Sequence, residues 1–285
     1  MRATDLSALR DLLAPSRLTH VVDVGANPLD GGKPPYLPML NAGLCHVTGF
    51  EPQEKELLVL QLTRGPNERY LPYAVGDGSS HTLKVCRATG MTSLLEPDPA
   101  TLGLFPTLQP CGEVIERIPV ETRRLDDICE IEHLDLLKID IQGSELSVFQ
   151  NGQQKLAEAV AIQTEVSFIT WYQNQPSFGE VDLELRRQGF IPHCLTELRG
   201  RPIGDFEVGD DALPQVNQLT EADIVYVRDF IHPDVVTDEQ LKHLGLIAHH
   251  CYGSFDLAFR CVQLLEERHV VEAESSQRYL SLSNG

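Results

Sequence analysis

The 285-residue sequence predicts an α/β protein whose sheet is mostly parallel and covered by helices on both faces. Short apolar runs typical of buried strands alternate with segments of helical spacing. Several of the apolar runs end in an acidic or amide residue, and parallel sheets bind ligands at the carboxyl ends of their strands. The sequence therefore predicts a ligand site along one edge of the sheet.

The predicted strands are short and stop at glycine, proline or charged residues. They lie at residues 19–26, 46–52, 69–78, 81–88, within 114–128, and at 135–143, 159–167, 190–198 and 222–229. We expect the strand at 81–88 to pair back as a hairpin. The acidic strand ends then bring Glu51, Asp77, Asp140 and Glu165 to one edge.

Helical spacing separates these strands. The predicted helices lie at residues 36–44, 53–64, 178–190 and 238–269, after an amphipathic lead-in, and residues 144–158 are predicted as helix, turn and helix. Ser144, directly after the predicted strand at 135–143, is the expected N-cap of the helix that follows. We expect an N-terminal helical lead-in over residues 1–18, a ligand-binding domain over 19–230 and a C-terminal helical extension over 231–285, which can pair with a second copy as a homodimer.

Composition excludes several function classes. A formal net charge of −19 without a basic cluster disfavours nucleic acid as a partner. No apolar run approaches the ~20 residues that span a bilayer, and charges interrupt the N-terminal stretch, so we expect a cytoplasmic protein without membrane contact. The seven cysteines are scattered without a C-x-x-C pair, which argues against a disulfide scaffold and a structural zinc site.

The first strand turns at "VVDVGANPLDGG", residues 21–32, and this turn selects among nucleotide ligands. Only Gly25 fits the G-x-G-x-x-G fingerprint of dinucleotide sites, and no phosphate-binding lysine follows. Asn27 suits a turn because asparagine tolerates left-handed backbone. Glu51, at the end of the second strand, is placed to accept hydrogen bonds from ribose hydroxyls. A ligand with a ribose but no phosphate fits this pattern, and S-adenosylmethionine is such a ligand.

Nine motifs extend this interpretation over residues 19–229, in the order "DVGAN", "GFEP", "YAVGDG", "TSLLEP", "RRLDDI", "LLKIDIQGSELSVFQNG", "TEVSF", "NQL" and "ADIVYVRD". With them the sequence resembles the FkbM family of methyltransferases, which have the class I S-adenosylmethionine-dependent fold. The resemblance implies a Rossmann-like seven-stranded sheet whose last strand is antiparallel. It also implies methylation of a hydroxyl on a sugar or small natural product.

The resemblance assigns cofactor-binding roles to matching residues. Gly25 and Asn27 would line the methionine part, Glu51 would hold the ribose, and Asp77 would lie near the adenine. Asp140 would face the transferred methyl group. Two further residues, Asp23 and Pro52, belong to the cofactor-binding set through "DVGAN" and "FEP".

One departure from the family pattern is the loop at residues 28–38, where Pro28, Pro34 and Pro35 prevent an immediate helix. This loop can cover the cofactor or shape the acceptor pocket, with Asp30 and Tyr36 reaching inward.

Methylation of a hydroxyl needs a group that removes its proton. The candidates are Asp140, Glu165 and His193, each expected at the ligand edge. Structural alternatives are a helix cap for Asp140 and ordinary packing for His193. Asp140 and Glu165 together could also bind a divalent metal. Two carboxylates alone are a weak signal for a metal site, so we do not favour one.

Neighbouring residues have a structural and a functional interpretation each. Lys138 shares a strand face with Asp140, and an internal salt bridge is its expected use. Glu145 is placed either to stabilise a helix start or to contact ligand. The remaining candidates are Thr92 and Ser93 in a loop over the site, the aromatic Trp171 and Tyr172, and the pair His249 and His250, expected at a surface or oligomer contact.

Two other functions stay open at this stage. An N-methyltransferase acting on a small amine would have the same cofactor site. A non-catalytic Rossmann-like binding module would keep the fold without the reaction, and an NAD-dependent dehydrogenase is disfavoured by the missing glycines.

Overall fold

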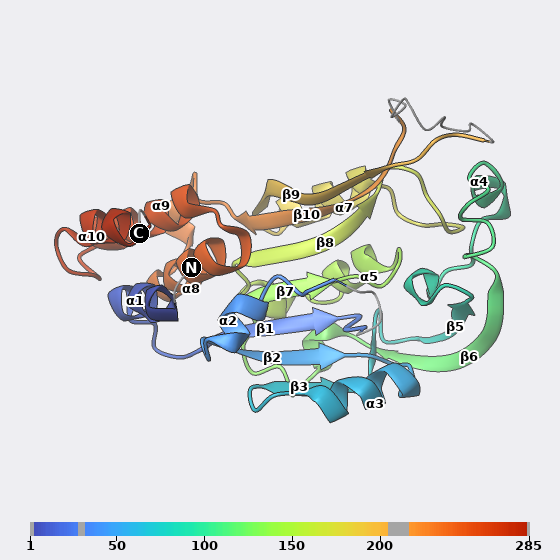
Figure 1. Ribbon diagram of the computed structural model, residues 1–285, viewed down its shortest axis with the longest axis horizontal. Helices are drawn as coiled ribbons and strands as arrows, with labels where there is room; N and C mark the ends of the chain where they lie inside the picture. The colour runs from blue at the N-terminus through green and yellow to red at the C-terminus, as the bar shows by residue number, and fades with distance from the viewer. Residues whose placement is uncertain (1–2, 28–31, 205–216, 284–285) are drawn as a thin grey trace.

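The computed structural model describes residues 3–27, 32–204 and 217–283, and its central feature is a seven-stranded sheet (Figure 1). The strand order is β3-β2-β1-β7-β8-β10-β9. Neighbouring strands are parallel except β10, which is antiparallel to β8 and β9. The strands are β1 Thr19–Val24, β2 Cys45–Phe50, β3 Glu68–Leu71, β7 Leu136–Ile139, β8 Ala161–Ser167, β9 Phe190–Gly200 and β10 Leu219–Arg228. The predicted α/β fold, with the last strand antiparallel, is confirmed.

Helices cover both faces of this sheet. Both chain termini lie at one end of the molecule (Figure 1), among α1 Ala3–Leu13, α8 Asp238–Tyr252, α9 Phe255–Glu267 and α10 Ser275–Ser283. The other helices are α2 Leu37–Asn41, α3 Glu54–Thr63, α4 Pro99–Gly103, α5 Glu145–Gln150, α6 Gln153–Leu156 and α7 Phe178–Arg187. In the described part of the chain, no helix has the length and apolar character needed to cross a membrane.

A smaller sheet of order β4-β6-β5 joins β4 Ala74–Val75, β5 Ser80–Cys86 and β6 Val114–Arg123. The single strand predicted at 69–78 is therefore wrong, because the chain leaves the large sheet after Leu71 and enters the small one at Ala74. Pro72 has no N–H to continue the first ladder, which explains the break. β5 pairs antiparallel with β6 instead of turning back on the strand before it.

One face of the large sheet changes character along its strands. Side chains two residues apart point to the same face, so Val21 and Asp23 of β1 share it. The strand register places Asp23 beside Lys138 and Lys138 beside Gln163, which makes one polar row. The row two residues earlier is apolar and contains Val21, Leu136 and Ala161.

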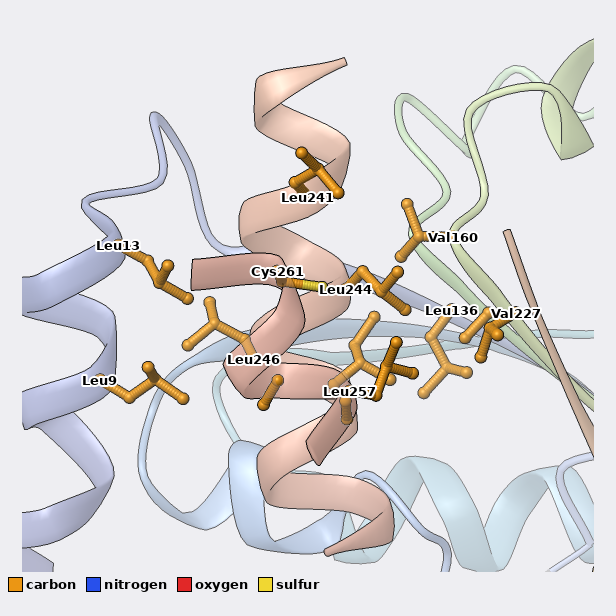
Figure 2. Packing of buried hydrophobic residues seen from close by; sticks show 14 of the residues in the cluster. Leu9, Leu13, Leu136, Val160, Val227, Leu241, Leu244, Leu246, Leu257 and Cys261 are labelled. Carbon is orange, nitrogen blue, oxygen red and sulfur yellow. The ribbon is translucent and has the colours of Figure 1, made fainter. Parts of the chain in front are cut away.

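The apolar row lies under the helices of both termini (Figure 2). Leu136 is fully buried in a cluster to which α1 contributes Leu9 and Leu13, α8 contributes Leu244, and α9 contributes Cys261. We call this part the covered half of the face. The open half comprises the polar residues beyond it, which are Asp23, Lys138, Gln163, Glu165 and Asp223.

The opposite face is mostly apolar near the carboxyl ends of the central strands. Val24, Ile139 and Val166 belong to a second buried cluster. Phe149 of α5 and Leu185 of α7 cover it. Near the carboxyl ends of the central strands, the polar side chains of the described sheet therefore gather on the face of Asp23 and Lys138.

The C-terminal helices correct one expectation. His249 and His250 are 4% and 5% exposed, so their predicted place at a surface or oligomer contact is wrong. α8 is packed between the sheet, α1 and α9, which buries more than one of its sides. All seven cysteines are free thiols, as the sequence indicated.

Candidate active site

The turn after β1 brings two strand ends into close contact. Gly25 has φ +80°, and a Cβ on it would lie 2.0 Å from the carbonyl oxygen of Asp140. The N–H groups of Gly25 and Ala26 both donate to the Phe50 carbonyl at 3.1 Å. Only glycine permits this approach, so Gly25, and not Asn27, supplies the left-handed backbone of the turn.

Glu51 lies at the end of β2 beside this turn. Its side chain is buried, and Oε1 accepts a hydrogen bond from the Gln53 N–H at 2.8 Å. A cleft of about 70 Å³, which we call the Glu51 cleft, opens between the turn and the segment 89–94. Its polar lining includes Asn27, Glu51, Thr92, Ser93 and Asp140, and its apolar lining includes Phe50, Pro52, Tyr73, Val75, Leu83 and Leu94.

The loop after β7 presents Asp140. The buried Glu145 carboxylate accepts from the N–H groups of Ile141 at 2.9 Å and Gly143 at 3.0 Å, and so ties this loop together. Burial raises the pKa of Glu145 to about 7, although these backbone bonds oppose the rise. Ser144 stands at the predicted N-cap but makes no capping bond with its hydroxyl. Of the two roles considered for Glu145, a structural one and a ligand contact, these bonds support the structural one.

Asp140 and Glu165 are brought together by one side chain, Gln142. Its Nε2 donates to Asp140 Oδ1 at 2.7 Å and to Glu165 Oε1 at 3.3 Å. Tyr172 Oη lies 3.0 Å from Gln142 Oε1, which orients the amide. Two of the three proposed proton acceptors thus share a site. Across the described residues, no group of three or more His, Cys, Asp or Glu side chains is arranged to hold a metal ion.

A second cavity of about 220 Å³, the Trp171 cavity, adjoins the Glu51 cleft through Asp140 and Gln142. Glu165 Oε2 lies 3.2 Å from Arg199, which also lies 3.3 Å from Glu221. The Trp171 indole N–H donates to Glu221 at 2.9 Å. Burial, with Asp140 and Glu221 nearby, raises the pKa of Glu165 well above its ordinary value.

A third cavity of about 690 Å³, the Gln163 cavity, lies over the open half of the sheet. Asp23 accepts from Tyr36 Oη at 2.6 Å and lies 3.3 Å from Lys138 Nζ. Burial would lower the pKa of Lys138, but Asp23 and Asp140 outweigh it and raise that pKa. The predicted salt bridge of Lys138 and the inward position of Tyr36 are confirmed, whereas Asp30 lies outside the described residues.

Two predicted site residues lie elsewhere. Asp77 accepts from the Ser79 N–H at 2.9 Å and contacts His81 at 2.9 Å, so its carboxylate holds a turn and is absent from the described lining of the Glu51 cleft. Burial opposes these bonds, but they lower its pKa to about 2. His193 Nε2 lies 2.8 Å from Ser254 Oγ at the start of α9. Its predicted place at the ligand edge is wrong, because it lies near the beginning of β9.

The sequence interpretation missed Arg199, Glu221, Gln142 and Gln163. Arg199 and Glu221 face each other across the β9–β10 pair, in a register that has irregularities. The contact becomes visible only when the pairing of β9 with β10 is known. Gln142 lies inside the "KIDIQGSE" motif, which was recognised without a role for the amide.

Comparison with known proteins gives the family. The model of the methyltransferase FkbM domain matches residues 23–192, more than half of the chain. A 61-residue segment is 43% identical to the 2-O-methyltransferase NoeI of Sinorhizobium fredii (strain NBRC 101917 / NGR234). That segment covers 20% of this chain and about a quarter, 25%, of NoeI.

Solved structures give weaker similarities. Magnesium protoporphyrin IX methyltransferase (ChlM) from Synechocystis PCC 6803, with bound SAM, has a TM-score of 0.37 and 11% identity, covering 79% of this chain and 78% of its own. The 16S rRNA (adenine(1408)-N(1))-methyltransferase from Catenulisporales acidiphilia has a TM-score of 0.33 and 11% identity, and the match covers 80% of this chain and 94% of that methyltransferase. Similarities of this size do not bear on substrate. On the match to the domain model over residues 23–192, the chain belongs to the FkbM family of S-adenosylmethionine-dependent methyltransferases.

Proposed function

We propose that the protein transfers a methyl group from S-adenosylmethionine to a hydroxyl on a sugar or small natural product. One observation carries this proposal. Asp140 lines both the Glu51 cleft and the Trp171 cavity, so one carboxylate stands at the junction of two spaces. A transferase that joins a cofactor to a separate acceptor needs such a junction.

The Glu51 cleft has the chemistry of a site for the adenosine part of the cofactor. Phe50, Tyr73, Leu83 and Leu94 provide apolar walls for a planar base. Glu51 supplies carboxylate oxygens for ribose hydroxyls. The close contact of Gly25 with the Asp140 carbonyl holds the ends of β1 and β7 together beside this cleft.

The methionine part of the cofactor would pass Asn27 and Asp140, which line both the Glu51 cleft and the Gln163 cavity. Asp23 and Lys138 lie beneath this passage and are paired with each other. We therefore propose Asp23 as a support of the cofactor site, whereas Asp77 is left out of it.

When bound, S-adenosylmethionine supplies an electrophilic methyl group on a sulfonium. Asp140 accepts the proton of the acceptor hydroxyl on a carboxylate oxygen, and Gln142 keeps that carboxylate in place through its 2.7 Å bond. Glu165, whose carboxylate lies 3.2 Å from Arg199, lines the Trp171 cavity and is the second candidate to accept this proton. Trp171 closes the cavity with an aromatic wall.

The NoeI similarity supports a hydroxyl as acceptor, since that relative is named a 2-O-methyltransferase. N-methylation of a small amine is the second candidate. Its supporting observation is that three carboxylates, those of Asp140, Glu165 and Glu221, line the Trp171 cavity against two cations, Arg199 and Arg201, and an excess of carboxylates attracts a cation. We further propose residues 19–230 as the catalytic unit, with the terminal helices as its structural cover.

Calorimetric titration with S-adenosylhomocysteine tests the cofactor site. We expect wild type to bind, and Glu51→Ala to weaken the affinity about 10- to 150-fold, since hydrogen bonds to a charged group contribute ~1.5–3 kcal/mol each. Glu54→Ala, at the exposed start of α3, is the matched control and leaves the affinity unchanged. Failure of wild type to bind would favour the non-catalytic module. Equal binding by Glu51→Ala would remove Glu51 from the site.

A further inference from the structure

The Gln163 cavity is larger than the cofactor tail requires. It measures about 690 Å³ against about 220 Å³ for the Trp171 cavity, and the two share Asp140 and Arg199. The tail would occupy only the end near Asn27. The rest of the cavity extends over β8, β10 and β9, beside the space proposed for the acceptor.

The floor of this cavity holds a buried polar group without a partner. Gln163 is 9% exposed, and its Oε1 has no hydrogen-bond partner among the described residues. A buried acceptor left unsatisfied destabilises a fold, so its retention points to a group that bonds it from the cavity. Gln163 is not one of the family motif residues used above, and it has no part in the proposed reaction.

The two cations of the floor that lie over the sheet, Lys138 and Arg199, are both paired with carboxylates. Asp23 and Lys138 are 3.3 Å apart. Arg199 lies within 3.3 Å of Glu165 and Glu221 and within 2.6 Å of Glu197. Asp140 and Asp223 line the same floor and take part in no ion pair among the described residues. Carboxylates therefore exceed cations in this floor, which disfavours an anionic ligand and offers hydrogen-bond acceptors to the hydroxyls of a neutral one.

The walls are apolar. Tyr36 and Tyr70 are 2% and 8% exposed and line the cavity together with Pro34 and Pro35. A polar floor beneath aromatic and proline walls matches a ring with hydroxyls on its rim and C–H groups on its faces. Neutral saccharide units have this structure.

We propose that the Gln163 cavity is a second acceptor subsite, which binds a further neutral saccharide unit next to the unit that is methylated. The acceptor is then a glycoside or oligosaccharide of at least two units, and Arg199 separates the two subsites. This inference rests on the proposed function and adds the size and neutrality of its acceptor.

The experiment measures methyl transfer from labelled S-adenosylmethionine to methyl glycosides of neutral hexoses and to neutral hexose oligosaccharides of two to four units. We expect KM at least 10-fold lower for the longer acceptors. Gln163→Leu, which keeps the side-chain volume, should raise KM for these about 10-fold and leave kcat and the one-unit KM unchanged. Asp223→Asn, on the same floor, should act in the same direction. Gln154→Leu, on the exposed surface of α6, is the control.

Four outcomes would overturn the inference. The first three are transfer to one-unit acceptors with equal or better KM, equal effects of Gln163→Leu on short and long acceptors, and transfer to charged glycans or amines only. Binding of S-adenosylhomocysteine without transfer to any neutral saccharide also overturns it while leaving the cofactor site standing. Absence of that binding removes the proposed function itself.

Discussion

The covered and open halves of one sheet face differ within two residues of each strand. Leu136 is buried under terminal helices, and Lys138 of the same strand faces a cavity. On the opposite face Ile139 stays apolar because α5 and α7 extend over it. The difference shows that the cover, and not the strand, decides where polar chemistry is possible. Where the helices stop, charged groups appear and pair with each other.

Asp140→Asn tests the open half and should give the largest effect. If Asp140 removes the acceptor proton, kcat/KM falls about 10²- to 10⁴-fold, the usual contribution of a general base. Unfolding free energy should change by less than ~1 kcal/mol, because Asp140 lies outside both apolar clusters. Methyl transfer and urea denaturation of the same preparation measure both. Asp127→Asn, at an exposed carboxylate, is the control. Full activity of Asp140→Asn would transfer the proton-acceptor role to Glu165.

Leu136→Ala tests the covered half and should show the reverse pattern. Its side chain is 0% exposed, so the truncation should lower the free energy of unfolding by ~2–5 kcal/mol. Affinity of the folded protein for S-adenosylhomocysteine should stay the same. Leu62→Ala, at a leucine 76% exposed on α3, should change stability by under ~0.5 kcal/mol. If Leu136→Ala weakens binding without unfolding the protein, the two halves are not separate in function.

This division explains what could be predicted from the sequence. Apolar runs such as "LLKI" and the order of motifs predicted the strands, and the positions of Glu51, Asp140 and Glu165 at strand ends followed from strand direction alone. His193 was misplaced because it lies near the beginning of β9, at the end away from the ligand edge, where it contacts Ser254 at the start of α9. Strand ends fix backbone position, but neighbours decide whether a side chain faces ligand.

Asp77 and Arg199 are two further residues whose side-chain contacts could not be predicted from strand position. Asp77 follows its strand as expected, but a local turn with Ser79 and His81 occupies the carboxylate. Arg199 joins Glu165 and Glu221 across strands whose register contains irregularities, and no short-range pattern encodes that pairing. Long-range contacts of this kind depend on how the whole sheet is assembled.

The smallest expected effect concerns pH and the cover itself. His250 of α8 is buried, neither ring nitrogen has a partner among the described residues, and burial lowers its pKa to about 4. The unfolded chain, with a histidine pKa near 6.5, binds more protons between pH ~6.5 and ~4, so this group reduces stability as pH falls through that range. Between pH 7 and pH 5, the free energy of unfolding of His250→Phe should therefore fall by ~1–2 kcal/mol less than that of wild type, as measured by urea denaturation.

Glu145, whose pKa of about 7 has the opposite effect, is present in both proteins and cancels in the difference. His269→Gln, at an exposed histidine, should leave the wild-type pH dependence intact. Identical slopes for wild type and His250→Phe would mean that α8 admits water around the protonated ring, and then the cover is less tightly closed than the apolar cluster beneath it indicates.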